Sequence, residues 1–409
     1  MSLKRKGTWL AAWALALLAG MPAWAQGLRD AQLFAPAEPS HYGGGVRANE
    51  GFFFVYDGLY WTISPPQTAI FGVDTSTLEV QRTVYWGPDD SQTSTQGSTM
   101  DTSFMTADFV FGHRIELGHI SEHAGWMLSY FNLHWLTQAR TLPAVQVYFN
   151  DEEWGAEGLP HLVGDVNPSG LIENIQNLGV QFENVTLVNA TKVWGTEFDI
   201  LIRTHPRQRG GMWEWFLGLR YLEFNEAFNA TCFGTIFDGE GNLKLNPDIL
   251  ADTFINAWAA NHMLGPQLGL RWFHSNDRWQ LSAEGKFMAA WNSQVVRLHG
   301  AVGTELTAIA PSERNAFLPL SMQATNFSYD ERMSVFSPVV ELRLELKYQL
   351  TRAVAFRLGW NGMYIDNLAR PSRMINYELG QTSVMGILRN LNRDLVFMQG
   401  LAAGIEINR

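Results

Sequence analysis

The 409-residue chain contains one cysteine, Cys232, so it cannot form an intrachain disulfide. After the first 25 residues, no apolar run reaches the roughly 18 residues of a membrane-spanning helix, which disfavours a helical membrane protein. Cations are also few, with 29 Lys and Arg against 40 Asp and Glu and a formal net charge of −11. This acidic balance argues against nucleic acid and against binding to anionic lipid through a basic patch.

Familiar catalytic motifs are missing as well. We find no G-x-S-x-G, no P-loop and no G-x-G-x-x-G. The segment HISEH (His119–His123) matches a zinc protease pattern, but that chemistry needs a helix and these residues fall in a predicted turn. The segment DGEGN (Asp238–Asn242) lacks the calcium-loop spacing, because Ile249 stands where a glutamate is needed. Cys232 has no base nearby in the sequence. We therefore expect no enzyme, no metal site and no cofactor.

The first 25 residues have the features of a secretory signal peptide. A basic segment, Lys4–Lys6, precedes the apolar stretch Trp9–Leu18, and Ala23-Trp24-Ala25 is an A-x-A cleavage site. The mature chain should then begin at Gln26. Removing the three cations changes the formal net charge from −11 to −14. The sequence thus predicts Sec-type export with cleavage after Ala25.

Strict alternation of polar and apolar residues is the strongest pattern in the chain. In VVELRLELKYQL (Val339–Leu350), one set of alternate residues is charged or polar, and from Val340 onward the other set is apolar. Successive side chains of a β-strand point to opposite faces, so such runs predict strands with one charged and one apolar face. The pattern recurs in Asp108–Leu117, Gly195–Arg203, Gly211–Phe224 and Arg278–Phe287.

Strand length and aromatic placement indicate which face is turned outward. The runs are roughly nine to fourteen residues long, whereas soluble strands average about 5–6 and tilted membrane strands need about 9–11. Trp213 and Tyr221 would lie about 20 Å apart along the membrane normal, close to the height of a barrel's apolar band. This predicts a lipid-facing aromatic girdle of Trp213, Trp215, Tyr221, Trp272, Trp279, Tyr348, Trp360 and Tyr364. Alternation alone would also fit a soluble protein that buries its leucines.

Short and long connections alternate along the chain. Four short turns join four hairpins, and single strands, Phe52–Ile63 and Leu395–Asn408, flank them. The pattern predicts a single all-β domain, a transmembrane antiparallel up-and-down barrel of ten strands with short periplasmic turns and long external loops. Both termini then lie on the short-turn side. The long connection Thr137–Trp194 could hide one further hairpin, so twelve strands is the alternative. The predicted division is 1–25 signal peptide, 26–50 linker or plug, and 51–409 barrel.

Several segments in fixed order also resemble a known family. They are GFFFVYDGLYW (Gly51–Trp61), GLRYLEFNE (Gly218–Glu226), GPQLGLR (Gly265–Arg271), RLGWNGMYIDNLARP (Arg357–Pro371) and GLAAGIEI (Gly400–Ile407). Together these resemble the planctomycete family of outer-membrane β-barrel porins, from roughly Gly51 to the C-terminus. The resemblance implies an outer-membrane barrel with a pore function, and it carries over no functional residue. One departure is the end of the chain, Ile407-Asn408-Arg409, because outer-membrane barrels commonly end on an aromatic residue that the assembly machinery reads.

The charged faces of the predicted strands form the candidate site. If they face the lumen, its lining includes Arg114, Glu116, Glu197, Asp199, Arg203, Glu214, Arg220, Arg271, Glu284, Lys286, Glu341, Arg343, Glu345, Lys347, Arg357 and Asn361. A three-residue turn at Leu350–Arg352 would place Glu345 directly opposite Arg357. Such charges could line a narrow ionic pore, or pair across the lumen and close it.

We therefore expect a passive pore for small polar solutes or ions. The alternative is a plugged structural or adhesive barrel with functional external loops; a barrel enzyme and a soluble exported all-β binding protein are less favoured. Expected partners are outer-membrane lipid, the barrel-assembly machinery and small polar solutes or ions, without nucleic acid. The sequence leaves the oligomeric state open.

Overall fold

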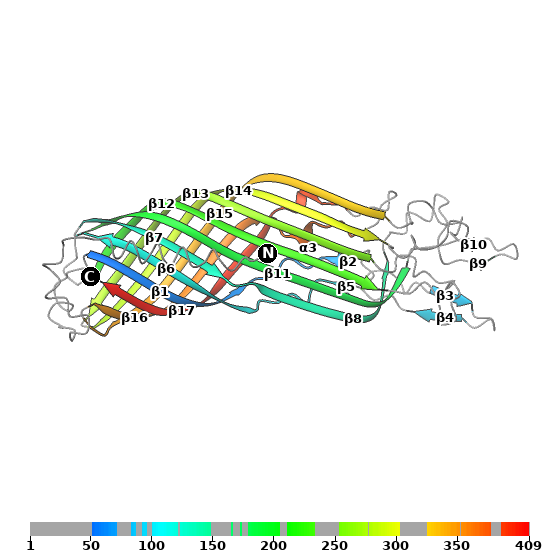
Figure 1. The fold of residues 1–409 in the computed structure, drawn as a ribbon, viewed down its shortest axis with the longest axis horizontal. Helices are drawn as coiled ribbons and strands as arrows, with labels where there is room; N and C mark the ends of the chain where they lie inside the picture. Colours follow the sequence, from blue (N-terminus) through cyan, green and yellow to red (C-terminus); the bar gives the residue numbers. More distant parts are fainter. Residues whose placement is uncertain are drawn as a thin grey trace, which may run out of the picture.

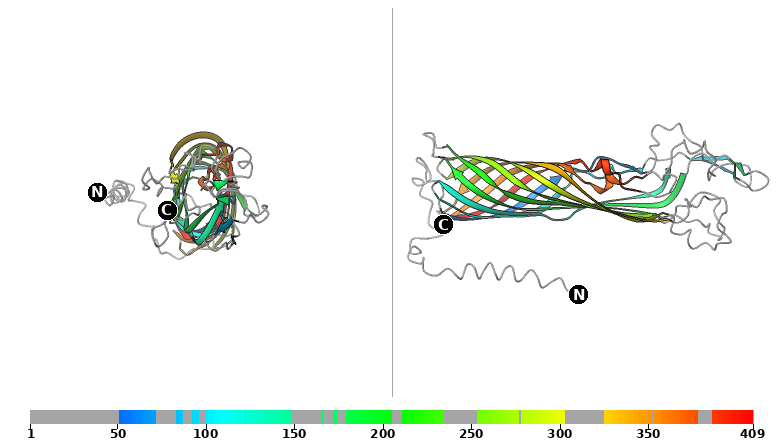
Figure 2. Two further views of the ribbon diagram at one scale, coloured as in Figure 1. Left: turned by 90° about the vertical axis from the view of Figure 1, so that its right-hand side faces the viewer. Right: turned by 90° about the horizontal axis from the view of Figure 1, so that it is seen from above.

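The computed structural model describes residues 51–71, 83–86, 92–95, 100–121, 123–148, 165–166, 172–173, 179–204, 211–233, 253–276, 278–302, 325–351, 353–377 and 386–408. Ten strands form one barrel (Figures 1 and 2): β1 (Gly51–Ile63), β6 (Phe109–Ile120), β7 (Ala124–Leu133), β11 (Gly179–Arg203), β12 (Gly211–Phe233), β13 (Thr253–Asn276), β14 (Trp279–Val302), β15 (Thr325–Gln349), β16 (Val354–Leu368) and β17 (Asp394–Asn408). None of the described helices is long and apolar enough to cross a bilayer.

Several short elements complete the described part of the chain. They are β2 (Ile70–Phe71), β3 (Thr83–Trp86), β4 (Gln92–Thr95), β5 (Met100–Asp101), β8 (Leu136–Tyr148), β9 (Asp165–Val166), β10 (Ile172–Glu173), α3 (Pro371–Met374) and η6 (Arg389–Leu391). Residues 1–50, with the predicted signal peptide and linker, lie outside the described residues, so the predicted domain division remains a prediction.

We call the half of the barrel that carries the short turns its lower half. In this half the ring of strands closes without a free edge. Each strand pairs antiparallel with its neighbours in the order β1, β6, β7, β11 to β17, and β17 pairs back onto β1. Phe53 of β1 stands opposite Asn408 of β17, so both ends of the barrel sequence lie at the end that carries the short turns. The prediction of a ten-stranded up-and-down barrel is confirmed.

The twelve-strand alternative is wrong. Its two candidate segments do pair, with Val147 opposite Val180, but they are continuations of barrel strands. β7 pairs with the lower half of β11. The strand is interrupted at His134–Trp135, and β8 then pairs with the upper half of the same β11. The long connection therefore lengthens an existing hairpin and adds no strand to the ring.

The barrel is much taller on one side than on the other. β11 to β15 have 23 to 25 residues each, whereas β1, β6, β7, β16 and β17 have 10 to 15. A tilted strand crosses the apolar layer with about 9–11 residues. The sheet formed by β8 and β11 to β15 therefore continues well beyond the membrane on the side of the long loops (Figure 2).

Exposure decides which face of the strands meets lipid. On β15, Leu342 and Leu344 are 52% and 53% exposed, whereas Glu341 and Arg343 between them are 1% and 7% exposed. The same reversal holds on β12, where Leu217 is exposed and Arg220 is buried. A protein in water would not expose this band and bury its charges. The alternative of a soluble exported protein is therefore wrong.

The predicted register of the β15–β16 hairpin is wrong by two residues. Lys347, not Glu345, stands directly opposite Arg357, because the ladder ends at Gln349 and Ala355. Five residues rather than three form the turn, and it is closed by the N–H of Leu350, which donates to the carbonyl of Val354 over 3.0 Å. The longer turn displaces β16 by two residues along β15.

Candidate functional site

An ion-pair network fills the lower half of the lumen. Arg343 of β15 donates from Nε to Glu341 Oε1 over 2.6 Å and from Nη1 to Glu116 Oε1 over 2.8 Å. Glu116 lies on β6, which three strands separate from β15 along the shorter path around the ring. These side chains therefore meet across the lumen and not along the wall.

Further pairs cross the lumen from the other side. Arg220 of β12 donates to Glu341 Oε2 over 2.6 Å, and Lys286 of β14 bonds Glu197 and Asp199 of β11 over 2.8 and 2.9 Å. All five of these side chains are at most 4% exposed. Such charges are stable inside a barrel only when well paired, because desolvation of an unpaired charge costs several kcal/mol.

Nearer the short turns, a second layer of pairs continues the network. Its pairs are Arg203 with Glu214 (2.6 Å), Arg271 with Glu284 (2.7 Å) and Glu214 (3.1 Å), Lys347 with Glu406 (2.8 Å), and Arg357 with Glu116 (3.4 Å) and Glu345. On the other side of the Arg343–Glu116 contact, Arg114 donates to Glu341 over 3.4 Å. Although Glu345 is diagonal to Arg357 in the ladder, the long guanidinium side chain still reaches it.

Glycine makes room for two of the lumen carboxylates. Gly218 is paired with Asp199, and a Cβ at this position would lie 2.2 Å from Asp199 Oδ1. Gly404 is likewise paired with Asp57, with the same 2.2 Å clearance to Asp57 Oδ1. The wall therefore uses residues without a side chain where a carboxylate lies flat against it.

The predicted lining residues are distributed as follows. Thirteen of the sixteen are buried: Arg114, Glu116, Glu197, Asp199, Arg203, Glu214, Arg220, Glu284, Lys286, Glu341, Arg343, Lys347 and Asn361. Arg271, Glu345 and Arg357 are partly exposed. Fifteen take part in the ion pairs above, and Asn361 lies beside Arg343 in the ladder. That these residues line a conducting pore remains a prediction.

The predicted girdle residues lie on the outer face. Trp215 and Trp279 are the most exposed, while the rest are partly exposed: Trp213, Tyr221, Trp272, Tyr348, Trp360 and Tyr364. Near the short turns, Trp279 packs on Tyr348 with ring centroids 4.6 Å apart, and Trp213 pairs with Trp272. Trp360 pairs with Leu344 and Leu401 and so lies within the apolar band.

Sequence reasoning missed two carboxylates of the network, Asp57 and Glu406. Glu406 is an even number of residues from Gly400 and Gly404 and so lies on the same face of the last strand, which means that the alternation could have identified it. Asp57 is harder to find, because both faces of β1 are rich in apolar residues and the sequence of β1 therefore shows no clear polar–apolar alternation.

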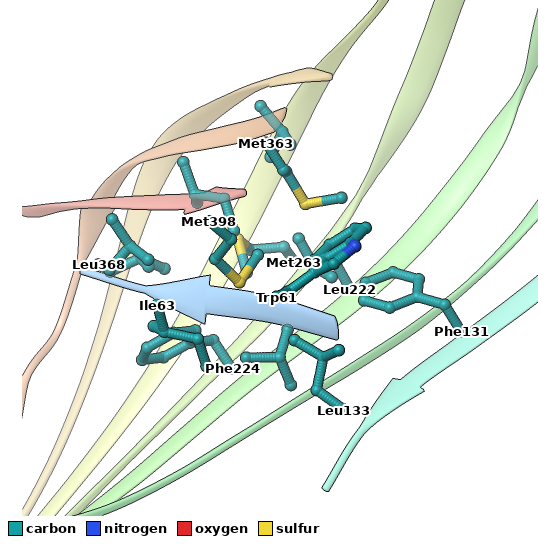
Figure 3. Packing of buried hydrophobic residues seen from close by; sticks show 14 of the residues in the cluster. Trp61, Ile63, Phe131, Leu133, Leu222, Phe224, Met263, Met363, Leu368 and Met398 are labelled. Atoms are coloured by element: carbon teal, nitrogen blue, oxygen red, sulfur yellow. The ribbon is translucent and has the colours of Figure 1, made fainter. Parts of the chain in front are cut away.

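A layer of apolar side chains lies inside the barrel above the network (Figure 3). Trp61, Met263, Met363 and Met398 point inward from four different strands and are all 0% exposed. Ile63, Phe131, Leu133, Leu222, Phe224 and Leu368 complete the labelled part of the layer (Figure 3). Apart from the indole N–H of Trp61, these labelled side chains carry no N–H or O–H group, so they offer water and ions few partners, and we call this layer the dry layer.

The connection between β16 and β17 folds into the barrel above this layer. Arg370 donates to both carboxylate oxygens of Glu226 over 2.8 and 2.7 Å, and to the carbonyl of Ser64 over 2.9 Å. Asn189 donates to the same carboxylate over 2.9 Å. Arg370 and Glu226 are 1% and 0% exposed, so this bidentate pair latches the connection to the far wall.

Asn367 directs the connection inward. Its φ of 59° is in the left-handed region, which asparagine tolerates better than most residues. Its carbonyl accepts hydrogen bonds from Asn292, Gln294 and Ser337 over 3.2, 2.9 and 3.0 Å. Three hydrogen bonds from side chains of β14 and β15 to this one oxygen thereby offset the free-energy cost of the left-handed backbone at Asn367.

The remaining sequence motifs have ordinary settings. His119 lies on β6 and not on a helix. Within the described ranges, no three His, Cys, Asp or Glu side chains gather closely enough to hold a metal ion. Cys232 lies eleven residues beyond Tyr221 on β12, above the apolar band, and burial raises the pKa of its thiol to about 12. The segment Asp238–Asn242 lies outside the described residues.

The family is identified by residues 171–408, which match the model of the family described as Putative beta barrel porin-7 (BBP7). The match covers more than half of the chain. This chain belongs to the BBP7 family. It is an outer-membrane β-barrel protein, and its family assignment places it among porins. A comparison with curated proteins found no match.

The solved structures found by comparison share little sequence with this BBP7 barrel. The outer-membrane protease OmpT from Escherichia coli is 9% identical, with a TM-score of 0.39, over 90% of this chain and 100% of that one. A Pseudomonas aeruginosa FadL homologue is 7% identical (TM-score 0.21, 87% and 90% covered). The P. putida toluene transporter TodX is 8% identical (TM-score 0.18, 88% and 91% covered).

The expectation that the chain is not an enzyme must be corrected. An outer-membrane protease is among the similar structures, so the barrel fold does not exclude catalysis. The sequence argument relied on missing motifs, and motifs do not report sites that a barrel assembles from separate loops. At 9% identity and a TM-score of 0.39, the likeness carries no protease activity over to this chain.

Proposed function

We propose that this BBP7 barrel is a plugged surface barrel, whose membrane part anchors a tall extracellular sheet and its loops. The observation that carries the proposal is the contact of Arg343 on β15 with Glu116 on β6, across the lumen. An open ionic pore needs a water-filled path with solvated charges. Here Arg343 and Glu116 pair directly with each other, with side chains only 8% and 2% exposed.

Two further layers support the same conclusion. A hydrated ion that passed the network would next meet the dry layer around Trp61 and Met363. Above that layer it would meet the inward-folded connection, latched by Arg370 to Glu226. Three barriers of different chemistry in series favour a closed lumen over passive diffusion.

The extracellular half supports a function at the cell surface. β12 continues for twelve residues beyond Tyr221, which at about 3.3 Å per residue and a tilt near 40° is roughly 30 Å above the apolar band. A passive pore gains nothing from such an extension. A barrel that displays its loops away from the membrane does.

Planar-bilayer recording tests the proposal. We expect the mature protein, refolded in detergent and shown to have inserted by protease protection of its lower half, to carry no measurable current in potassium chloride. Discrete ohmic steps from the unmodified protein would contradict the plug and support the passive pore for small polar solutes or ions.

A gated pore is the second candidate, favoured by the BBP7 family description and by the way the connection is held. Arg370 contacts the opposite wall through side-chain hydrogen bonds to Glu226, which can break without unfolding a strand. Arg370→Met should then produce intermittent steps if gating is the function, whereas Arg332→Met on the outer face of β15 should stay silent. Silence of both variants would leave the plugged barrel as the better proposal.

Several finer expectations belong with this proposal. They are cleavage after Ala25, kinship with planctomycete porins, insertion by the barrel-assembly machinery, and contact with outer-membrane lipid. N-terminal sequencing of the protein recovered from membranes would test the first, with Gln26 as the expected first residue.

A further inference from the structure

A continuous row of aromatic and imidazole rings crosses the outer face of five strands. His113 of β6 lies 6.0 Å from Tyr130 of β7, and Tyr130 lies 6.3 Å from Trp194 of β11, measured between ring centroids. Trp194 is 5.3 Å from Tyr221 of β12, which stacks on His262 of β13 at 6.5 Å. We call these five residues the ring row.

The ring row follows the upper boundary of the apolar band on β7, β11 and β12. Immediately below it, toward the short turns, lie the exposed side chains of Leu128, Phe198, Leu219 and Leu264. Above it stand the polar side chains Asn132 on β7 and Asn225 on β12, whereas on β6 the exposed Phe109 and Phe111 lie above His113. Aromatic rings with a polar edge prefer this depth, where lipid headgroups begin.

Basic groups gather at the β6–β11 end of the row. His134 lies 6.1 Å from His113, between ring centroids, and is exposed. Lys192 of β11 places Nζ 5.7 Å from the ring centroid of Trp135, which is itself 53% exposed. A lysine on an aromatic face at the membrane boundary keeps its ammonium at headgroup depth.

The acid beside the row is engaged with its own neighbours. Glu223 accepts a hydrogen bond from Tyr221 over 2.9 Å and one from Asn225 over 2.5 Å, and it lies 3.5 Å from His262. It therefore stands at the β12–β13 end and not between Lys192 and the two histidines. On β14 and β15 the outward cation Arg297 is instead paired with Asp330 over 3.2 Å.

We propose that Lys192, His113 and His134 form a docking surface for a phosphate-bearing lipid headgroup of the outer leaflet. The ammonium and the ring N–H groups are donors suited to phosphate oxygens, and charge-assisted bonds of this kind are the strong ones. Leu128 and Phe198 below them would contact the acyl chains. The combination of phosphate donors above and apolar side chains below fits a lipid and not a free anion.

Native mass spectrometry of the full mature protein in detergent tests this. The probes are phosphatidic acid, which carries a phosphomonoester, and phosphatidylcholine with identical acyl chains. We expect phosphatidic acid to bind more tightly, and Lys192→Gln with His134→Gln to weaken its binding about tenfold or more, since a charge-assisted bond contributes about 1.5–3 kcal/mol. Arg332→Gln, an exposed cation of β15 away from the row, is the matched control and should change binding less than about twofold.

Three outcomes would overturn the proposal. Equal binding of the two lipids would mean that the headgroup is not recognised. Unchanged binding by the double variant would exclude this surface. Displacement by millimolar inorganic phosphate at the affinity of the lipid would mean that the surface takes free phosphate. A melting temperature of the double variant equal to that of the unmodified protein keeps a folding defect apart from lost binding.

Discussion

Replacing Arg343 with methionine removes the cation at the centre of the lumen network. The guanidinium donates to Glu341 and Glu116 over 2.6 and 2.8 Å, and lies 3.6 Å from carboxylate oxygens of Glu197 and Glu284. Methionine keeps much of the volume but leaves these buried acids with fewer cations. Removing one partner of a buried pair typically costs about 3–5 kcal/mol, and we expect Arg343→Met to lower the free energy of unfolding by that amount.

A second substitution, at Glu116, tests whether the lost free energy of unfolding comes from the ion-pair network. Glu116→Gln alone should also destabilise the barrel, because Arg343 and Arg357 both contact this carboxylate. The double variant should cost less than the sum of the two, because no orphaned carboxylate then remains at position 116. A coupling energy above about 1 kcal/mol is the expected result for two groups in one network.

Equilibrium unfolding in urea from lipid vesicles, followed by tryptophan fluorescence, measures these free energies. Arg297→Met is the control, because Arg297 is 55% exposed and its pair with Asp330 should contribute about 0–1 kcal/mol. If Arg343→Met unfolded at the same urea concentration as this control, the network would not stabilise the barrel. The argument for a sealed lumen would then lose its energetic basis.

Three further predictions concern a glycine of the wall, the cysteine and the register of β15 and β16. Gly218→Ala should lower the urea midpoint, because a Cβ there would lie 2.1 Å from a carbonyl oxygen of β11, whereas Gly386→Ala, with nothing within 4 Å, should not. Cys232 should resist a maleimide at pH 8 until the barrel is unfolded, because burial raises the pKa of its thiol to about 12; rapid labelling of folded protein would contradict this. Leu346→Cys with Leu358→Cys should form a disulfide, since these residues are directly opposed, and crosslinking only to position 356 would refute the register.

The wall of the barrel could be predicted because most strands carry a charged face. On β15 and β12, alternation assigns every residue to the lumen or to lipid, and exposure agrees residue by residue. Alternation cannot show how far one strand slides along the next. The register of β15 and β16 was therefore wrong, because it depends on how many residues the turn at Leu350 takes up.

The contacts inside the lumen were beyond the sequence for a related reason. Parity indicates that Glu116 and Arg343 both point inward, but their meeting depends on the stagger of ten strands around the ring. The latch between Arg370 and Glu226 is harder still. It joins residues 144 positions apart, and nothing in the local pattern around Pro371 distinguishes an inward-folded connection from an external loop.

Closure of the ring has a consequence for how the chain must fold. β1 and β17 are partners, and Phe53 cannot find Asn408 until synthesis and export of the last residues are complete. Bringing together ends more than 340 residues apart carries a loop-closure cost that local hairpins do not offset early on. Chains truncated before β17 would keep exposed edges on β1 and β16, and such edges template aggregation. The fifteen residues of β17 therefore decide whether any of the preceding hairpins becomes a barrel.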